Sequence, residues 1–145
     1  MDGLKKIPSF DKDHNTLMPG LHEGGTIHGV TTWDLRFKRP NCGDFLDQAA
    51  LHSVEHMLAT VLRNSEQKDN IIYFGPMVCR TGFYLLTVNM NKAEVAALLK
   101  KSFALALDMD KVPGAKKEEC GNYLEHDLQG AKSECKRYLE ILSDV

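Results

Sequence analysis

The feature that most constrains the fold of this 145-residue chain is a change in the spacing of its apolar residues at Pro40. Between residues 26 and 38, apolar and polar side chains alternate, which predicts a strand with one buried face. From residue 44 to residue 63, apolar side chains recur at helical spacing, which predicts an amphipathic helix with Asp44 as its N-cap. The first half of the chain therefore combines a half-buried strand with a helix whose apolar stripe needs a partner.

Similar patterns continue toward the C-terminus. An apolar run at 71–74 is ended by Gly75-Pro76, and residues 83–88 have the character of a second strand. Asn91 with Glu94 resembles a capping box at the start of another helix, and the last helix is expected from about residue 127 to residue 142. Neighbouring strands with few helices indicate an α+β fold, an antiparallel sheet with helices packed on one face, in a single domain over residues 1–145.

Composition places the chain among ordinary globular proteins. Hydrophobic residues make up 43% and charged residues 26%, and the net charge is −2. No basic stripe with interleaved aromatic residues is present, which argues against nucleic acid as a partner. The polar start, Met1 to Lys6, does not resemble a signal peptide, and no apolar segment reaches the length of a membrane span. We therefore expect no membrane association and a cytoplasmic location.

The strongest local motif is His52-Ser53-Val54-Glu55-His56, within the predicted helix. Residues four apart lie on one face of a helix, so the two histidines can bind one metal ion. Glu55 lies near the same face, where a carboxylate can act as a general base. The alternative is a solvated helix face on which these residues meet by chance. The same H-x-x-E-H order is also found in inverted zinc peptidases.

Two histidines are too few for a stable catalytic metal site, which usually has three protein ligands. Cys79, Cys120, His126 and several carboxylates are candidates for the third, and the composition does not choose among them. Cys79 lies between Gly75-Pro76 and Gly82, in a predicted turn of the kind that often carries catalytic groups. For each cysteine, the alternative is a small buried apolar residue without chemistry.

Five blocks of the sequence carry a resemblance. They are residues 52–56, residues 76–84, Glu119-Cys120-Gly121 followed by residues 126–132, Ser9-Phe10 with residues 13–15, and residues 33–37 with Pro40-Asn41. In this order they resemble the signature blocks of S-ribosylhomocysteine lyase, the LuxS family. Two departures are Val78, where many relatives have Gly, and Tyr73-Phe74-Gly75 in place of a more usual Asp-Ile-Ser stretch.

The resemblance implies a role for each matching residue. It implies that the metal ligands are His52, His56 and Cys120, that Glu55 and Cys79 form an acid–base pair, and that the substrate pocket is lined by Ser9, His14, Arg36 and Arg63. In the same pattern His126 supports the last helix and is not a ligand. The family's usual metal is Fe(2+), for which zinc or cobalt can substitute, although two histidines and a cysteine alone would have suggested zinc.

The resemblance also implies a reaction and an assembly. The reaction cleaves S-ribosylhomocysteine to homocysteine and 4,5-dihydroxypentane-2,3-dione, the precursor of autoinducer-2, by carbonyl migration through enediolates and β-elimination. The assembly is a homodimer in which the N-terminal segment of one chain completes the active site of the other. The alternatives are a metallopeptidase with the inverted motif and a non-catalytic metal-bound sensor of the same fold. Retention of Glu55 and Cys79 argues against the sensor.

Overall fold

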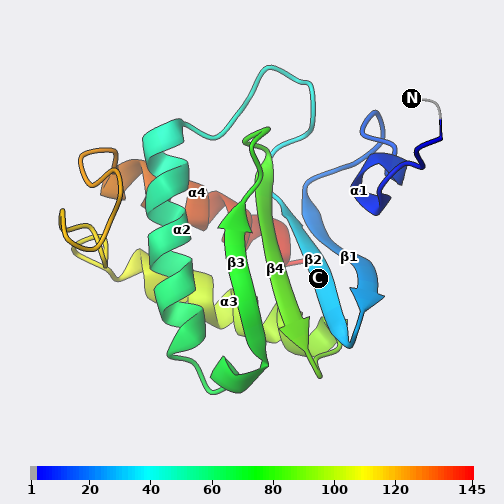
Figure 1. Cartoon of the computed structure of the whole chain (residues 1–145). Coiled ribbons are helices and arrows are strands. Elements are labelled where there is room, and N and C mark those ends of the chain that lie inside the picture. The colour runs from blue at the N-terminus through cyan, green and yellow to red at the C-terminus, as the bar shows by residue number, and fades with distance from the viewer. Residues whose placement is uncertain (1–2) are drawn as a thin grey trace.

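The computed structural model describes residues 3–145, and Met1 and Asp2 of the polar start lie outside the described residues. Within residues 3–145, four antiparallel strands form one sheet in the order β1-β2-β4-β3 (Figure 1). The strands are β1 (Gly20–Ile27), β2 (Val30–Arg36), β3 (Ile71–Pro76) and β4 (Gly82–Val88), and the helices are α1 (Pro8–Asp11), α2 (Gln48–Arg63), the short 3-10 helix η1 (Lys68–Asn70), α3 (Lys92–Leu107) and α4 (Leu128–Leu142). The predicted α+β class is confirmed. In the described part of the chain, the helices are too short or too polar to cross a membrane.

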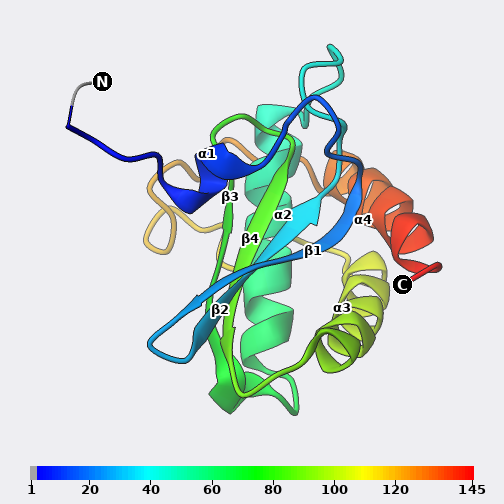
Figure 2. The same ribbon diagram turned by 90° about the vertical axis from the view of Figure 1, so that its right-hand side faces the viewer.

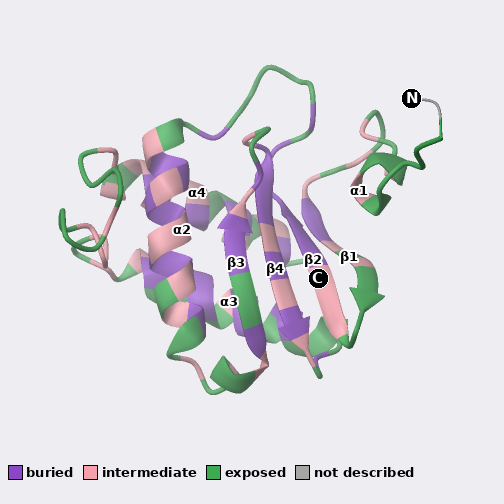
Figure 3. Ribbon diagram, viewed as in Figure 1, coloured by how far each residue is buried: buried purple, intermediate pink, exposed green. Residues whose placement is uncertain are grey.

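The two faces of the sheet are covered differently. Helices α3 and α4 lie behind the sheet in Figure 1 and α2 lies beside β3, whereas the rotated view of Figure 2 shows α1 on the opposite face. Buried residues concentrate in β4, in the second half of β2 and on the sides of the long helices that face the sheet, whereas the second half of β1 is mostly exposed (Figure 3). The predicted arrangement, helices on one face of an antiparallel sheet, therefore holds for the long helices, and the N-terminal segment partly covers the other face.

The predicted strand at 26–38 is in fact divided between two strands. His28 and Gly29 both have positive φ, 52° and 80°, and they join β1 to β2 in a two-residue turn. Turns with φ positive at both central residues match the twist of paired strands, and glycine favours them. Residues 26 and 27 therefore end β1, a strand that was not predicted, and the alternating pattern belongs to β2.

The start of α2 also differs from the prediction. The helix begins at Gln48, and its N-cap is Asp47, whose carboxylate accepts a hydrogen bond from the backbone N–H of Ala50 at 3.3 Å. Asp44 instead lies outside the helix and forms an ion pair with Lys38 at 3.4 Å. Either aspartate suits an N-cap by residue type, so only the folded backbone chooses between them.

The other predicted helix starts are confirmed. Asn91 and Glu94 form a reciprocal capping box at the start of α3, and Asp127 is the N-cap of α4. In the core, the Phe37 ring stacks on Tyr138 of α4 with centroids 4.2 Å apart. The Tyr138 hydroxyl donates a hydrogen bond to the carbonyl of Gly20 at 3.0 Å. These contacts fix α4 against the sheet and so fix the position of the residues just before it.

Candidate metal centre

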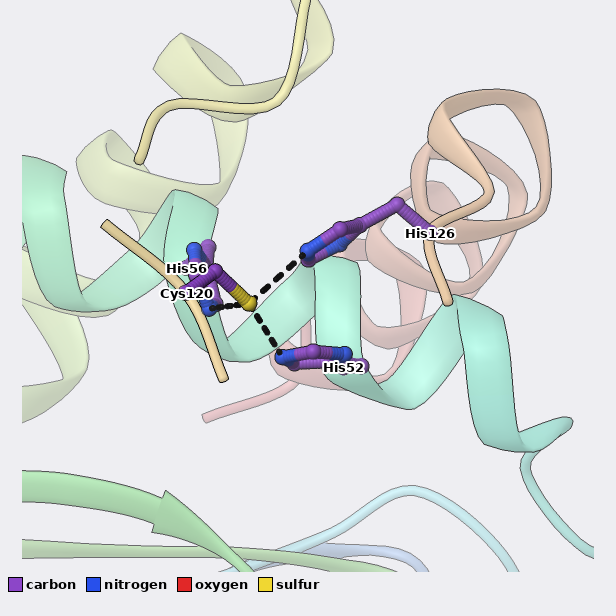
Figure 4. Close-up of side chains that lie close together, drawn as sticks. All are labelled: His52, His56, Cys120 and His126. Carbon is purple, nitrogen blue, oxygen red and sulfur yellow. Dashed lines mark hydrogen bonds between the residues drawn. The ribbon is translucent and has the colours of Figure 1, made fainter. Parts of the chain in front are cut away.

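Four side chains from three segments converge beside the first half of α2 (Figure 4). His52 and His56 come from successive turns of α2, Cys120 from the long connection after α3, and His126 from the residues just before α4. Their ligand atoms all lie within 4.8 Å of one another. The Cys120 Sγ atom lies 3.5 Å from Nε2 of His52 and 3.8 Å from Nε2 of His56.

These separations fit a metal ion. Zinc-like ions bind sulfur at about 2.3 Å and imidazole nitrogen at about 2.0–2.1 Å, so tetrahedral geometry places the two ligand atoms about 3.6 Å apart. The observed distances of 3.5 and 3.8 Å bracket that value. The ligand atoms are thus of a type that binds divalent metal ions, and their spacing fits such an ion.

The far nitrogens of the two helical histidines are fixed by main-chain carbonyls. Nδ1 of His52 donates to the carbonyl of Glu125 at 2.8 Å, and Nδ1 of His56 donates to the carbonyl of Pro113 at 3.0 Å. A carbonyl oxygen can only accept, so each ring carries its proton on Nδ1 and presents the lone pair of Nε2 to the cluster. Both rings are therefore held by the connection that also carries Cys120, with their Nε2 atoms facing the cluster.

Gly114, in that connection, packs against the His56 ring. A Cβ at this position would lie 3.3 Å from Nδ1 of His56, and the φ of Gly114 is +66°. Residues that carry a Cβ rarely adopt this backbone conformation, so a glycine here allows the connection to approach the His56 ring closely.

His126, one of the candidate third ligands, also lies in the cluster, although the family resemblance implied a role in supporting the last helix. Its Nε2 lies 3.6 Å from Cys120 Sγ, and its ring stacks on that of His52 at 4.1 Å. Burial, and then the charges that His52 and His56 carry when protonated, lower the pKa of His126 to about 4, so its ring is neutral at pH 7. Its Nδ1 lies 3.0 Å from the hydroxyl of Ser53. The prediction that His126 is not a ligand stays a prediction, because its distance to the sulfur matches those of the other histidines.

Glu55 and Cys79 lie apart from this group. Glu55 is half-buried on α2 between the two histidines, and Cys79 is exposed in the turn between β3 and β4. Among the described residues, the candidate metal group contains Cys120 and leaves out Cys79. The Cys79 Sγ atom instead lies 3.1 Å from the hydroxyl of Thr81.

Arg36 is connected to Cys79 through Thr81. The Arg36 guanidinium donates to the Thr81 hydroxyl oxygen at 2.8 Å, which leaves the hydroxyl hydrogen free to point toward the Cys79 sulfur. Arg36 also forms an ion pair with Asp34, and its side chain is only 2% exposed. Burial alone would raise the pKa of Asp34, but hydrogen bonds from Arg36 and Lys12 outweigh it and hold that pKa below its usual range.

The other predicted substrate residues lie away from the metal group. The Arg63 guanidinium donates to the carbonyl of Ile72 at 3.2 Å, beside the divergent stretch that begins at Tyr73. Arg63 lies seven positions after His56 on α2, which is about 10 Å along the helix axis. Arg63 therefore lies beside Ile72, about two helical turns away from His56.

The N-terminal candidates belong to the opposite face of the sheet. Ser9, in α1, lines a cleft of about 370 Å³ together with Thr32 and Tyr84 of the sheet. His14 follows α1, and its Nδ1 lies 2.9 Å from the carbonyl of Lys12. Figures 1 and 2 show this segment across the sheet from α3 and α4. Within one chain, Ser9 and His14 are not brought to the metal group.

Comparisons with known proteins agree on one family. A model of the S-ribosylhomocysteinase (LuxS) family matches residues 7–144. The chain is 43% identical to the S-ribosylhomocysteine lyase of Borreliella afzelii, over 98% of this chain and 95% of that protein. It is 45% identical to the protein of that name from Phocaeicola vulgatus, over 98% and 93% of the two chains, and 37% identical to that from Finegoldia magna, over 98% and 94%.

Proposed function

The chain belongs to the S-ribosylhomocysteinase (LuxS) family, and on that premise we propose that it cleaves S-ribosylhomocysteine to homocysteine and 4,5-dihydroxypentane-2,3-dione. The observation that carries the proposal is the convergence of His52, His56 and Cys120, with Cys79 left outside the metal group. One cysteine is thus available to hold a metal and another to move protons. The product is the precursor from which autoinducer-2 forms.

We propose that His52, His56 and Cys120 hold one Fe(2+) ion, for which zinc or cobalt can substitute. When bound, the ion supplies a Lewis acid that polarises a carbonyl of the sugar. The donor set favours a soft or borderline transition metal over magnesium or calcium, because those ions prefer oxygen ligands. The choice of iron rests on the family resemblance alone.

Glu55 and Cys79 are proposed to move the protons. Each carbonyl shift along the sugar removes a proton from the carbon beside the carbonyl and returns one to the former carbonyl carbon, through an enediolate. The final elimination removes a proton beside the new carbonyl, breaks the carbon–sulfur bond and releases the thiolate of homocysteine, which then takes up a proton. Redox balance is kept throughout, and the chain must supply only proton carriers.

The environment of Cys79 is suited to this role. Its sulfur faces the Thr81 hydroxyl, and that hydroxyl receives a hydrogen bond from Arg36. A hydrogen bond donated to sulfur stabilises the thiolate, the form of cysteine that accepts a proton. Arg36 is therefore proposed to act both as a substrate contact and, through Thr81, on the charge of Cys79.

We also propose a homodimer with shared active sites. In one chain, Ser9 and His14 lie on the face of the sheet opposite α3 and α4 and do not join the metal group. If they contact substrate, as their match to the family implies, a second chain must supply the metal group that they face. Arg63 is proposed to contact the amino-acid end of the substrate, beside the Tyr73-Phe74-Gly75 stretch.

The cytoplasm is the proposed location. Cys42, Cys79, Cys120 and Cys135 are all free thiols. Free thiols are usual in a reducing compartment, and both proposed cysteine functions require them.

One assay distinguishes this proposal from its two alternatives. S-ribosylhomocysteine is incubated with the iron-loaded protein, and released thiol is measured with a chromogenic disulfide. Release of stoichiometric homocysteine, abolished in Glu55→Gln, is expected. A metallopeptidase or a non-catalytic sensor would release no thiol, and that result would overturn the proposed reaction.

A further inference from the structure

In each of the three histidines of the metal group, Nδ1 faces away from the cluster, and its hydrogen-bond partner is not of the same kind in all three. For His52 and His56 the partner is a carbonyl oxygen, which can only accept. For His126 the partner is the hydroxyl of Ser53, which can donate or accept, at 3.0 Å from Nδ1. The position of the ring proton on His126 therefore depends on whether the Ser53 hydroxyl donates a hydrogen bond to Nδ1 or accepts one from it.

The surroundings of Ser53 decide this. Ser53 is fully buried on α2, and its oxygen already accepts the backbone N–H of Asp127 at 2.8 Å. Thr60 on the same helix donates its hydroxyl to the carbonyl four residues earlier, but in residues 3–145 Ser53 makes no such bond. The remaining acceptor for its hydrogen is Nδ1 of His126. If Nδ1 donated instead, the buried hydroxyl hydrogen would have no partner, which is costly.

With Nδ1 accepting a hydrogen bond from Ser53, the ring proton of His126 is on Nε2. That nitrogen lies 3.6 Å from the sulfur of Cys120, within the range of an N–H···S hydrogen bond (Figure 4). We infer that His126 is a positioning residue that donates its Nε2–H to the Cys120 thiolate and does not bind the metal, and that Ser53 fixes this tautomer. The inference rests on the proposed metal centre of His52, His56 and Cys120.

Two chemical consequences follow. A hydrogen bond to the thiolate withdraws charge from the sulfur, so the sulfur donates less to the ion and leaves it a stronger Lewis acid. Because His126 does not occupy a coordination position, three protein ligands remain and a position stays open for substrate, as in other catalytic sites. Ser53 thereby connects the metal group to the N-terminus of α4 through Asp127.

The first test reads the tautomer directly. The zinc-loaded protein, labelled with ¹⁵N in histidine, is examined by two-bond proton–nitrogen correlation NMR. We expect a protonated Nε2 and an unprotonated Nδ1 for His126, and the opposite pattern, with protonated Nδ1, for His52 and His56. A protonated Nδ1 on His126 would overturn the inference. In Ser53→Ala, the preference of His126 for the Nε2–H tautomer should be lost or weakened.

The second test compares two substitutions in the cobalt(II)-loaded protein. His126→Gln keeps an N–H donor without an imidazole ligand, whereas His126→Leu removes both. We expect the sulfur-to-cobalt charge-transfer band to stay in place in His126→Gln and to move to lower energy in His126→Leu, with the visible ligand-field bands unchanged in both. Chelator competition should show about 10-fold weaker metal binding in His126→Leu, because Cys120 loses the partner that holds its sulfur in the binding position, and near wild-type binding in His126→Gln.

The outcomes separate this inference from the proposed function. Equal changes in the ligand-field bands of both variants would show that His126 is a ligand, and the inference alone would be overturned. A wild-type protein that takes up neither zinc nor cobalt would overturn the metal centre and the inference together. Neither readout depends on turnover of S-ribosylhomocysteine, so a protein that binds metal without cleaving the substrate still tests the role of His126.

Discussion

The Sγ atom of Cys120 lies 3.5 Å from Nε2 of His52, although the two residues are 68 positions apart in the chain. The contact exists because the connection that follows α3 folds back over α2, where its carbonyls at Pro113 and Glu125 accept hydrogen bonds from the two helical histidines. The thiol and the imidazoles are thus held by one segment, and loss of the thiol should leave the imidazoles in place but without their third partner.

Metal content should distinguish the two cysteines of the site. Cys120→Ala is expected to lose most of its metal, because two histidines alone do not form a stable site. Cys79→Ala should keep about one metal per chain, since Cys79 lies outside the group. Elemental analysis after dialysis measures both variants. Full metal in Cys120→Ala together with loss in Cys79→Ala would exchange the proposed roles.

Turnover should depend on both of the proposed proton carriers, Glu55 and Cys79. Glu55→Gln and Cys79→Ala each leave the ligands untouched and are expected to fold and bind metal. Each should lower kcat for homocysteine release by about 10²–10⁴-fold, the usual cost of losing an acid–base group. Steady-state thiol release gives the rates, with metal content as the matched control. Either variant turning over near the wild-type rate would remove that residue from the mechanism.

The buried ion pair between Asp34 and Arg36 should contribute strongly to the stability of the fold at neutral pH. Asp34→Asn leaves the Arg36 guanidinium buried without its charged partner, which typically costs about 3–5 kcal/mol in the free energy of unfolding. Asp69→Asn is the matched control, because Asp69 is exposed and should change stability by less than about 0.5 kcal/mol. Urea unfolding at pH 7 measures both. Equal stability of the two variants would contradict the assigned role of the pair.

The same aspartate predicts a dependence on pH. Because the pKa of Asp34 is lowered in the folded protein, the unfolded chain binds the proton first as the pH falls. The stabilisation is complete above the ordinary aspartate pKa of about 3.9 and is lost progressively below it. Wild-type stability should therefore fall more steeply below about pH 4 than that of Asp34→Asn. Urea midpoints measured between pH 5 and pH 2.5 test this, and parallel curves would exclude the contribution.

Subunit mixing should reveal whether sites are shared. His14→Ala and Glu55→Gln, each expected to be inactive, are unfolded together in equal amounts and refolded with iron(II) in the absence of oxygen. In a shared site, every mixed dimer has one intact site and one with both lesions. Half of the dimers are mixed, so about a quarter of wild-type activity should return. No recovery, with mixed dimers shown to be present, would rule out sharing.

Much of the fold followed from local patterns. The capping box at Asn91 and the N-cap at Asp127 depend on residues three positions apart, so the sequence alone was sufficient to place α3 and the start of α4. The His52–His56 pair was equally local, since a helix fixes the spacing of residues four apart. Where the chain offered two equivalent choices, as at Asp44 and Asp47, local pattern was not enough.

What only the tertiary structure decided is how distant segments meet. The sequence named Cys79, Cys120 and His126 as candidate third ligands. The folded chain brought Cys120 and His126 to the helical pair and kept Cys79 in a turn beside Thr81. The carbonyls that orient the histidines and the hydroxyl of Ser53 that faces His126 have no pattern of their own in the sequence. Every residue has a carbonyl, and only the packing of the connection against α2 determines which ones reach an imidazole.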